Sequence, residues 1–154
     1  MQLGRRWIEE HVPHIGAMCL LDEVLEWDAD KIRCRAVSHR AADNPLRVRG
    51  RLGVACGIEY AAQAMALHGA LVASAPGSGG SVGYIASVRA VNLNVERLDD
   101  VEADLVATAD RISSDAATVL YEFSVWGAER ILLSGRATIV FGIVSPPPTQ
   151  RSTA

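Results

Sequence analysis

The sequence predicts an α+β fold in which an antiparallel sheet of about six strands wraps around one long central helix. Residues 57–73, GIEYAAQAMALHGALVA, are apolar around nearly the whole of a helical surface. Runs with a two-residue period, which is typical of strands, lie on both sides of this segment. A helix without a polar face needs cover on most of its sides, and an antiparallel sheet that curls around the helix supplies that cover.

The first half of the chain predicts a short helix and a hairpin. Residues 5–11, RRWIEEH, are expected to form a helical turn. Residues 18–28 and 31–39 are β-prone, and the turn between them is rich in Asp. In the second run apolar and polar side chains alternate, which indicates a strand with one exposed face. Residues 40–51 contain an Asp-Asn-Pro sequence and are expected to form a loop.

The second half predicts the central helix and the remaining strands. The helix is expected to run from about Gly53 to Ala73, and the Gly- and Ser-rich residues 74–83 are expected to break it. Short separators between the later runs are typical of antiparallel neighbours. We expect these strands at 83–98, 104–114, 118–127 and 130–142. The C-terminal segment is rich in Pro, Ser and Thr, so the prediction is one domain, residues 1–143, followed by a disordered tail, residues 144–154.

The composition excludes several classes of protein. Of the 154 residues, 49% are hydrophobic and 21% are charged, which fits a soluble globular domain. A net charge of −3 gives no general attraction to nucleic acid or to an anionic membrane. The three cysteines, Cys19, Cys34 and Cys56, lack the spacing of a zinc site or a disulfide framework. We therefore expect no metal, and a location in the reducing cytoplasm.

Glu59 stands alone in the most apolar part of the chain. It is the only formally charged side chain between Leu52 and Val88. A carboxylate in such surroundings needs a partner or a task, because its removal from water is costly. Gln63 lies four residues on and shares the helical face of Glu59, whereas His68 lies nine residues on and points away. We expect Gln63 to face the same site as Glu59, and His68 to be a core or interface histidine.

The start of the helix and the end of the second strand supply further candidates. Backbone N–H groups of Gly53, Val54 and Ala55 have no partner within a helix that begins there, and they could hold a thioester or phosphate oxygen. His39 follows the second strand and could pair with Glu59 as acid and base if the fold brings them together. Strand alternation places His39 on the polar face, so spacing alone favours a solvent-exposed loop residue.

The order of the motifs resembles one known family. Residues 13–28, PHIGAMCLLDEVLEWD, resemble the N-terminal signature of FabA/FabZ-type 3-hydroxyacyl-acyl-carrier-protein dehydratases, which have the hot-dog fold. Residues 57–69 resemble their central-helix motif, and residues 84–95, YIASVRAVNLNV, resemble a strand that follows it. Residues 38–52, SHRAADNPLRVRGRL, are more similar to the ApeP-like branch, which is associated with aryl-polyene gene clusters. The resemblance covers residues 11–142.

The resemblance implies a reaction and two catalytic residues. Matched to the family's motifs, His39 is the catalytic histidine and base, and Glu59 is the catalytic carboxylate and acid. The implied reaction converts 3-hydroxyacyl thioesters to trans-2-enoyl thioesters in fatty-acid or aryl-polyene (polyketide-type) biosynthesis. The substrate is carried on the phosphopantetheine of an acyl carrier protein, and no cofactor of the enzyme itself is expected. In this family the two residues meet across a dimer interface, which implies a homodimer or a heterodimer with another hot-dog protein.

The loop between the two residues departs from the family pattern. RAADNP follows His39 where dehydratases usually have HFPxxPxxPG, and the separation of His39 from Glu59 is longer than is typical of FabZ proteins. The oxyanion donors are therefore sought at the start of the helix. Arginines in the loop could hold the phosphopantetheine phosphate or the acidic carrier protein, although a solvated loop fits them equally well. The residues expected to bind substrate are Gly53, Val54, Ala55, Gln63, Arg47, Arg49 and Arg51.

Two other functions remain open at this point. In a hot-dog thioesterase, Glu59 would activate water and His39 would be dispensable. In a non-catalytic subunit, the chain would complete the site of a second hot-dog protein. The presence of both His39 and Glu59 favours the dehydratase over these alternatives.

Overall fold

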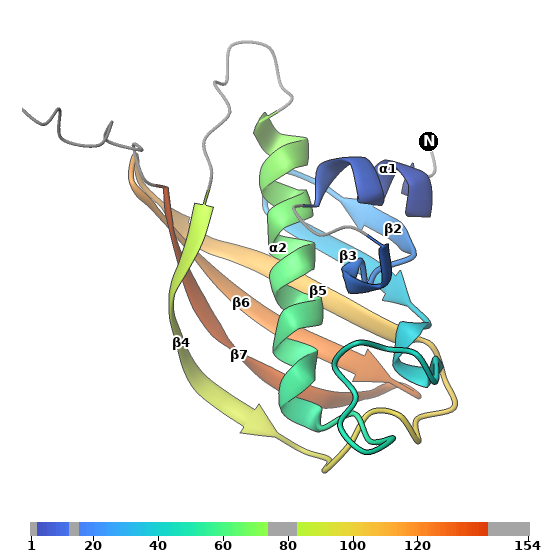
Figure 1. Ribbon diagram of the computed structural model, residues 1–154. Coiled ribbons are helices and arrows are strands. Elements are labelled where there is room, and N and C mark those ends of the chain that lie inside the picture. Colours follow the sequence, from blue (N-terminus) through green and yellow to red (C-terminus); the bar gives the residue numbers. More distant parts are fainter. Residues whose placement is uncertain (1–2, 13–15, 74–82, 142–154) are drawn as a thin grey trace, which may run out of the picture.

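The computed structural model describes residues 3–12, 16–73 and 83–141. Over these residues the predicted architecture is confirmed, since one antiparallel sheet curls around one long helix, α2 (Gly57–Ala73) (Figure 1). The predicted helix break, apart from Gly83, and the predicted tail at 144–154 lie outside the described residues. Among the described residues, no helix is both long and apolar enough to cross a bilayer.

The sheet contains seven strands over the described residues, in the order β1-β2-β3-β5-β6-β7-β4, and every neighbouring pair is antiparallel. Their bounds are β1 Leu3–Gly4, β2 Glu23–Trp27, β3 Lys31–Ala36, β4 Gly83–Leu93, β5 Leu105–Ser114, β6 Thr118–Gly127 and β7 Arg130–Phe141. The strand beyond the expected six is the two-residue β1. The strand order places β4, which follows α2 in the sequence, at the edge beside the last strand.

The shorter helical segments set the boundaries of the site. The predicted N-terminal helix is confirmed as α1, and three 3₁₀ turns interrupt the extended segments. Their bounds are α1 Arg5–His11, η1 Gly16–Met18, η2 Ser38–Arg40 and η3 Val54–Cys56. The α-helix begins at Gly57 rather than near Gly53, because the Val54 N–H donates to the Glu96 carbonyl and η3 comes between. A Cβ atom at Gly57 would overlap the Leu133 side chain, so glycine lets the start of α2 lie close to β7.

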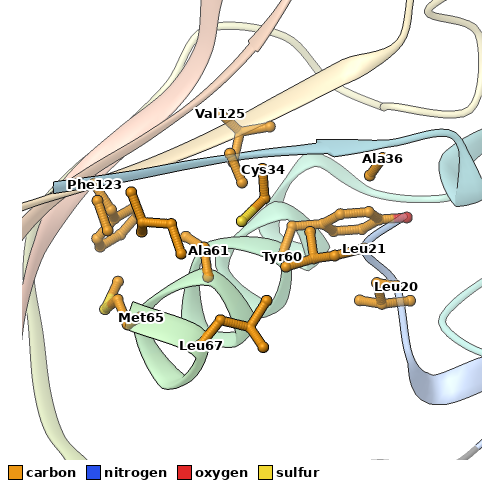
Figure 2. Packing of buried hydrophobic residues seen from close by; sticks show 14 of the residues in the cluster. Leu20, Leu21, Cys34, Ala36, Tyr60, Ala61, Met65, Leu67, Phe123 and Val125 are labelled. Carbon is orange, nitrogen blue, oxygen red and sulfur yellow. The ribbon is translucent and has the colours of Figure 1, made fainter. Parts of the chain in front are cut away.

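The core lies between α2 and the inner face of the sheet (Figure 2). Ala61 and Ala64 are fully buried, and their small side chains let the helix approach the strands. Tyr60 lies against the strand that carries Ala36, and Phe123 reaches the helix from β6. Burial of one large apolar side chain contributes about 1.5–3 kcal/mol, so this interface fixes where α2 sits.

Strand β4 is the exposed edge of the sheet. Among the described residues it pairs only with β7, and its apolar side chains include Tyr84, which is 55% exposed, and Leu93, which is 48% exposed. The pairing with β7 shifts register between Arg89 and Asn92, around Ala90, whose φ is +51°. An edge of this kind is a surface onto which another strand can add.

Candidate active site

His39 lies in the η2 turn directly after β3, and it is fully buried. The solvent-exposed position favoured by strand alternation is therefore wrong. The strand ends at Ala36, so alternation no longer decides where the side chain at 39 points. The 3₁₀ turn instead places the imidazole within hydrogen-bond distance of the segment that leads into β5.

The hydrogen bonds of His39 fix its tautomer. Nε2 lies 3.0 Å from the carbonyl oxygen of Val101 and 3.0 Å from that of Ala103. Carbonyl oxygens only accept, so Nε2 carries the hydrogen and Nδ1 holds the lone pair of the neutral ring. Nδ1 is buried and has no hydrogen-bond partner among the described residues. Burial lowers the pKa of His39, although the two carbonyl bonds act in the opposite direction, so the ring is neutral at neutral pH.

A buried polar network holds the His39 turn against α2. The Ser38 hydroxyl donates to the Leu20 carbonyl at 2.8 Å, so Tyr60 is the donor in its 2.8 Å bond to Ser38. The Asn44 amide donates to the Ser38 carbonyl at 2.9 Å and to the Tyr60 oxygen at 3.1 Å. Residues next to His39 and next to Glu59 are thereby joined through three side chains.

Glu59 lies in the first turn of α2 and is half-buried. The Gln63 amide donates to its Oε1 at 3.4 Å, as expected for residues that share a helical face. Gln63 also donates to the Met18 carbonyl at 2.7 Å and accepts the Leu20 N–H at 2.9 Å. Because Gln63 is buried and both of its amide hydrogens are used, it braces Glu59 and the 18–20 segment in the single chain.

A single chain does not join the two predicted catalytic side chains by a hydrogen bond. The ring of His39 bonds only to the 101–103 segment within the described residues, and Glu59 lies beside Gln63. The predicted meeting of His39 and Glu59 across a dimer interface stays a prediction.

The segment before α2 offers fewer free donors than the sequence predicts. The Val54 N–H is taken up by the Glu96 carbonyl at 3.1 Å. Gly53 is half-buried and Ala55 is exposed, and both remain candidates for oxyanion donors.

The arginines of the loop divide into braced and exposed side chains. Arg47 donates to the Gly50 carbonyl at 2.8 Å and to the His39 carbonyl at 3.2 Å, so it supports the loop. Arg49 and Arg51 are exposed, and Arg51 lies 3.5 Å from a carboxylate oxygen of Glu96. These two are the loop arginines best placed to meet an anion from solvent.

Sequence reasoning missed the residues that surround His39. Residues 99–103, between the strands expected at 83–98 and 104–114, were read only as a turn, yet the Val101 and Ala103 carbonyls set the tautomer. Asn44 was read only as part of a turn signal, yet it is buried and bonded to Tyr60. No local sequence pattern shows which backbone carbonyl will accept a hydrogen bond from a distant side chain. Among the described residues, no three His, Cys, Asp or Glu side chains gather closely enough to hold a metal ion.

Comparison with known proteins places this geometry in context. Residues 6–146 match the model of a family described as ApeP-like, ApeP dehydratase. A chain of the dehydratase heterocomplex ApeI:P from Xenorhabdus doucetiae is 20% identical, with a TM-score of 0.77 over 88% of this chain and 90% of that one. No curated protein matches the sequence.

Two further solved structures share the fold at lower similarity. AziG from S. sahachiroi is 16% identical, with a TM-score of 0.59 over 85% of this chain and 97% of its own. A mutant thioesterase from Pseudomonas aeruginosa is 13% identical, with a TM-score of 0.56 over 77% of this chain and 78% of its own. Together with the sheet wrapped around α2, these likenesses confirm the predicted hot-dog fold.

Proposed function

This chain belongs to the ApeP-like family of dehydratases, and from that premise we propose that it removes water from 3-hydroxyacyl thioesters carried on the phosphopantetheine of an acyl carrier protein. The product is the trans-2-enoyl thioester. The observation that carries the proposal is the lone pair on Nδ1 of His39, which is buried and has no hydrogen-bond partner among the described residues. Burial lowers the pKa of His39, so this nitrogen can accept a proton at neutral pH.

Each group has one role in the proposed reaction. Nδ1 of His39 takes the proton from the carbon next to the thioester carbonyl. Backbone N–H groups, with Gly53 and Ala55 as candidates, stabilise the charge that develops on the carbonyl oxygen. Glu59 gives its proton to the hydroxyl on the next carbon, the C–O bond breaks and water leaves. A positioned base or acid contributes about 10²–10⁴ in rate, and one oxyanion donor about 10²–10³.

The proposed site requires two chains. Within one chain no hydrogen bond joins His39 to Glu59, and β4 offers an unpaired edge with exposed apolar side chains. We place a second hot-dog chain along β4, either a copy of this chain or a related protein, so that Glu59 of one chain serves His39 of the other. Mixing separately inactive His39→Gln and Glu59→Gln chains would then restore part of the activity, because a mixed dimer contains one intact pair.

The carrier protein and the pathway follow from the loop and the family. Exposed Arg49 and Arg51 would attract an acidic carrier protein or the phosphate of its prosthetic arm. The ApeP-like family favours an aryl-polyene pathway over fatty-acid synthesis. The free cysteines Cys19, Cys34 and Cys56 are consistent with action in the cytoplasm.

One observation favours a second candidate function, a non-catalytic subunit that completes the site of another hot-dog protein. His39 is fully buried in the isolated chain, so a substrate reaches Nδ1 only after neighbouring residues move. A chain whose His39 stays closed would supply Glu59 alone to its partner. The dehydratase heterocomplex ApeI:P, one chain of which shares this fold, supports an assembly with a different protein.

The test is intact-mass analysis of a 3-hydroxyacyl carrier protein after incubation with the purified chain. Wild type should remove one water, and His39→Gln and Glu59→Gln should not. Glu122→Gln is the matched control, because Glu122 is an exposed carboxylate on β6. Release of free carrier protein would indicate thioester hydrolysis instead. An unchanged substrate with the chain alone, but water loss after a second hot-dog subunit is added, would favour the subunit function.

A further inference from the structure

The segment that orients His39 is held at both of its ends. Residues 96–104 belong to the connection between β4 and β5 and pass beside the start of α2 (Figure 1). Toward β5, Arg40 donates to the Glu102 carbonyl and lies 2.7 Å from a carboxylate oxygen of Asp104. At the other end the anchor is the side chain of Asp99.

Asp99 joins this segment to the chain that leads into α2. Its Oδ1 accepts the Leu52 N–H at 2.9 Å and the Arg97 Nε–H at 3.0 Å. Two backbone bonds run alongside, from Leu98 N–H to the Leu52 carbonyl at 2.8 Å and from Val54 N–H to the Glu96 carbonyl at 3.1 Å. The Asp99 side chain is only 7% exposed, and the Arg97 guanidinium holds the pKa of its carboxyl well below the usual range. The Asp99 carboxylate is therefore a charged anchor at neutral pH that is almost fully shielded from solvent.

The carbonyl groups that define the His39 tautomer lie between these two anchors. Both must stay within hydrogen-bond distance of a single N–H, since Nε2 is 3.0 Å from each oxygen. A shift of the segment by a fraction of an ångström would favour one carbonyl over the other and turn the ring. Turning the ring would move the Nδ1 lone pair away from the direction that proton transfer requires.

We infer that Asp99 is a positioning residue for the proposed dehydration: it fixes the 96–104 segment against the residues before α2, so that the Val101 and Ala103 carbonyls hold His39 in the Nε2–H tautomer with Nδ1 aimed for proton transfer. The inference rests on the proposed function for its kinetic consequence only. Asp99 also ties two parts of the site together, because the segment it holds contacts both His39 and the Leu52–Val54 stretch, which includes the candidate oxyanion donor Gly53.

Two substitutions of different severity test this role. Asp99→Asn keeps an oxygen for the Leu52 N–H but loses the charge that faces Arg97, whereas Asp99→Ala loses both. We expect kcat to fall up to about 10²-fold in Asp99→Ala and less in Asp99→Asn, with KM nearly unchanged. The control is Asp115→Asn, because Asp115 also accepts backbone N–H groups, from Ala117 and Thr118, but at the opposite end of β5. This control should keep wild-type kcat.

A second readout does not depend on activity. The ¹⁵N chemical shifts of the imidazole, assigned by comparison with His39→Gln, report which ring nitrogen carries the hydrogen. Wild type should show a protonated Nε2 and an unprotonated Nδ1, and Asp99→Ala should show a mixture of tautomers. Unchanged shifts in a folded Asp99→Ala protein would overturn the inference, as would a loss of kcat that merely follows the fraction unfolded. If wild type proved inactive both alone and with a second hot-dog subunit while its tautomer still depended on Asp99, the proposed function would fail and the positioning role would stand.

Discussion

Two histidines of this chain occupy nearly the same environment and differ at one atom. His39 and His68 are both fully buried, and burial lowers the pKa of each ring. Each uses Nε2 to bind backbone carbonyl oxygen, His39 at Val101 and Ala103 and His68 at Asp28, 2.9 Å away. Both are therefore neutral rings with the hydrogen on Nε2.

The difference lies at Nδ1. In His68 this nitrogen accepts the hydroxyl hydrogen of Tyr121 at 2.6 Å, and the two rings meet edge to face. In His39 it has no partner among the described residues. The predicted core role of His68 is thus confirmed, because every polar atom of its ring is satisfied. Burial and a lowered pKa do not distinguish His39, the proposed base, from His68, but the unused lone pair on Nδ1 of His39 does.

The largest effect is expected when His39 is replaced. His39→Gln keeps an amide donor for the Val101 and Ala103 carbonyls but has no basic nitrogen. We expect kcat for dehydration to fall by about 10²–10⁴, while the melting temperature stays close to that of wild type. Steady-state kinetics and thermal unfolding on the same preparation measure both. A His39→Gln protein with wild-type kcat would remove the distinction drawn between the two histidines.

The reverse effect is expected at the second histidine. Tyr121→Phe removes the hydroxyl donor and leaves Nδ1 of His68 unsatisfied, which makes it resemble His39. The free energy of unfolding should fall by about 1–3 kcal/mol, because a buried acceptor loses its partner. Denaturant unfolding measures the loss, and activity per folded molecule should not change. A fall in kcat in Tyr121→Phe as large as that in His39→Gln would contradict the structural role of His68.

Acid should weaken the fold through both rings together. Each folded pKa lies below the unfolded value of about 6.5, so the folded chain binds fewer protons than the unfolded chain. The stabilisation is complete above that pH and is lost as the pH falls toward the folded values. Each ring contributes a slope of up to about 1.4 kcal/mol per pH unit. Denaturant titrations between neutral pH and the acid range should show a shallower slope in His39→Gln than in wild type.

The smallest effect is expected at the turn between β6 and β7, where Ala128 and Glu129 are exposed and take no part in the hydrogen bonds of either ring. Ala128 has a φ of +51° and Glu129 a φ of +63°, although neither residue favours the left-handed region. Replacing them by Asn and Gly, the pair preferred in two-residue hairpin turns, should stabilise the fold by about 1 kcal/mol. Thermal unfolding checks the gain. The substitution should raise stability without changing kcat. It therefore serves as a control for any effect of stability on the measured activity.

The sequence predicted an element well where a clear periodic pattern is bounded by turn signals. Residues 118–127 were expected to form a strand and do so as β6, because alternation and short turns bound the run on both sides. The central helix was placed correctly at its C-terminal end, but its start was expected near Gly53 and lies at Gly57. That start depends on a long-range bond from Val54 to Glu96, which no local pattern reveals.

The environment of the site was harder to predict than its residues. His39 and Glu59 were chosen from motifs, yet spacing alone favoured an exposed His39. Its burial follows from a 3₁₀ turn and from a segment more than 60 residues away in the sequence, as the His39 bonds to Val101 and Ala103 show. Gln63 was expected to bind substrate, which stays a prediction, and the sequence did not reveal its hydrogen bonds to Met18 and Leu20. Such features depend on tertiary contacts rather than on periodicity.

The strand order also carries a consequence for the time at which this protein can assemble. The N-terminal side of the sheet can form early, but β4 pairs only with β7, the last strand of the described chain. During synthesis β4 must therefore wait, with its apolar side chains uncovered, until residues 130–141 have left the ribosome. Such delayed, long-range pairing is slow and exposes the chain to aggregation. Any partner that adds to the β4 edge can be selected only after residues 130–141 have been made and have paired with β4.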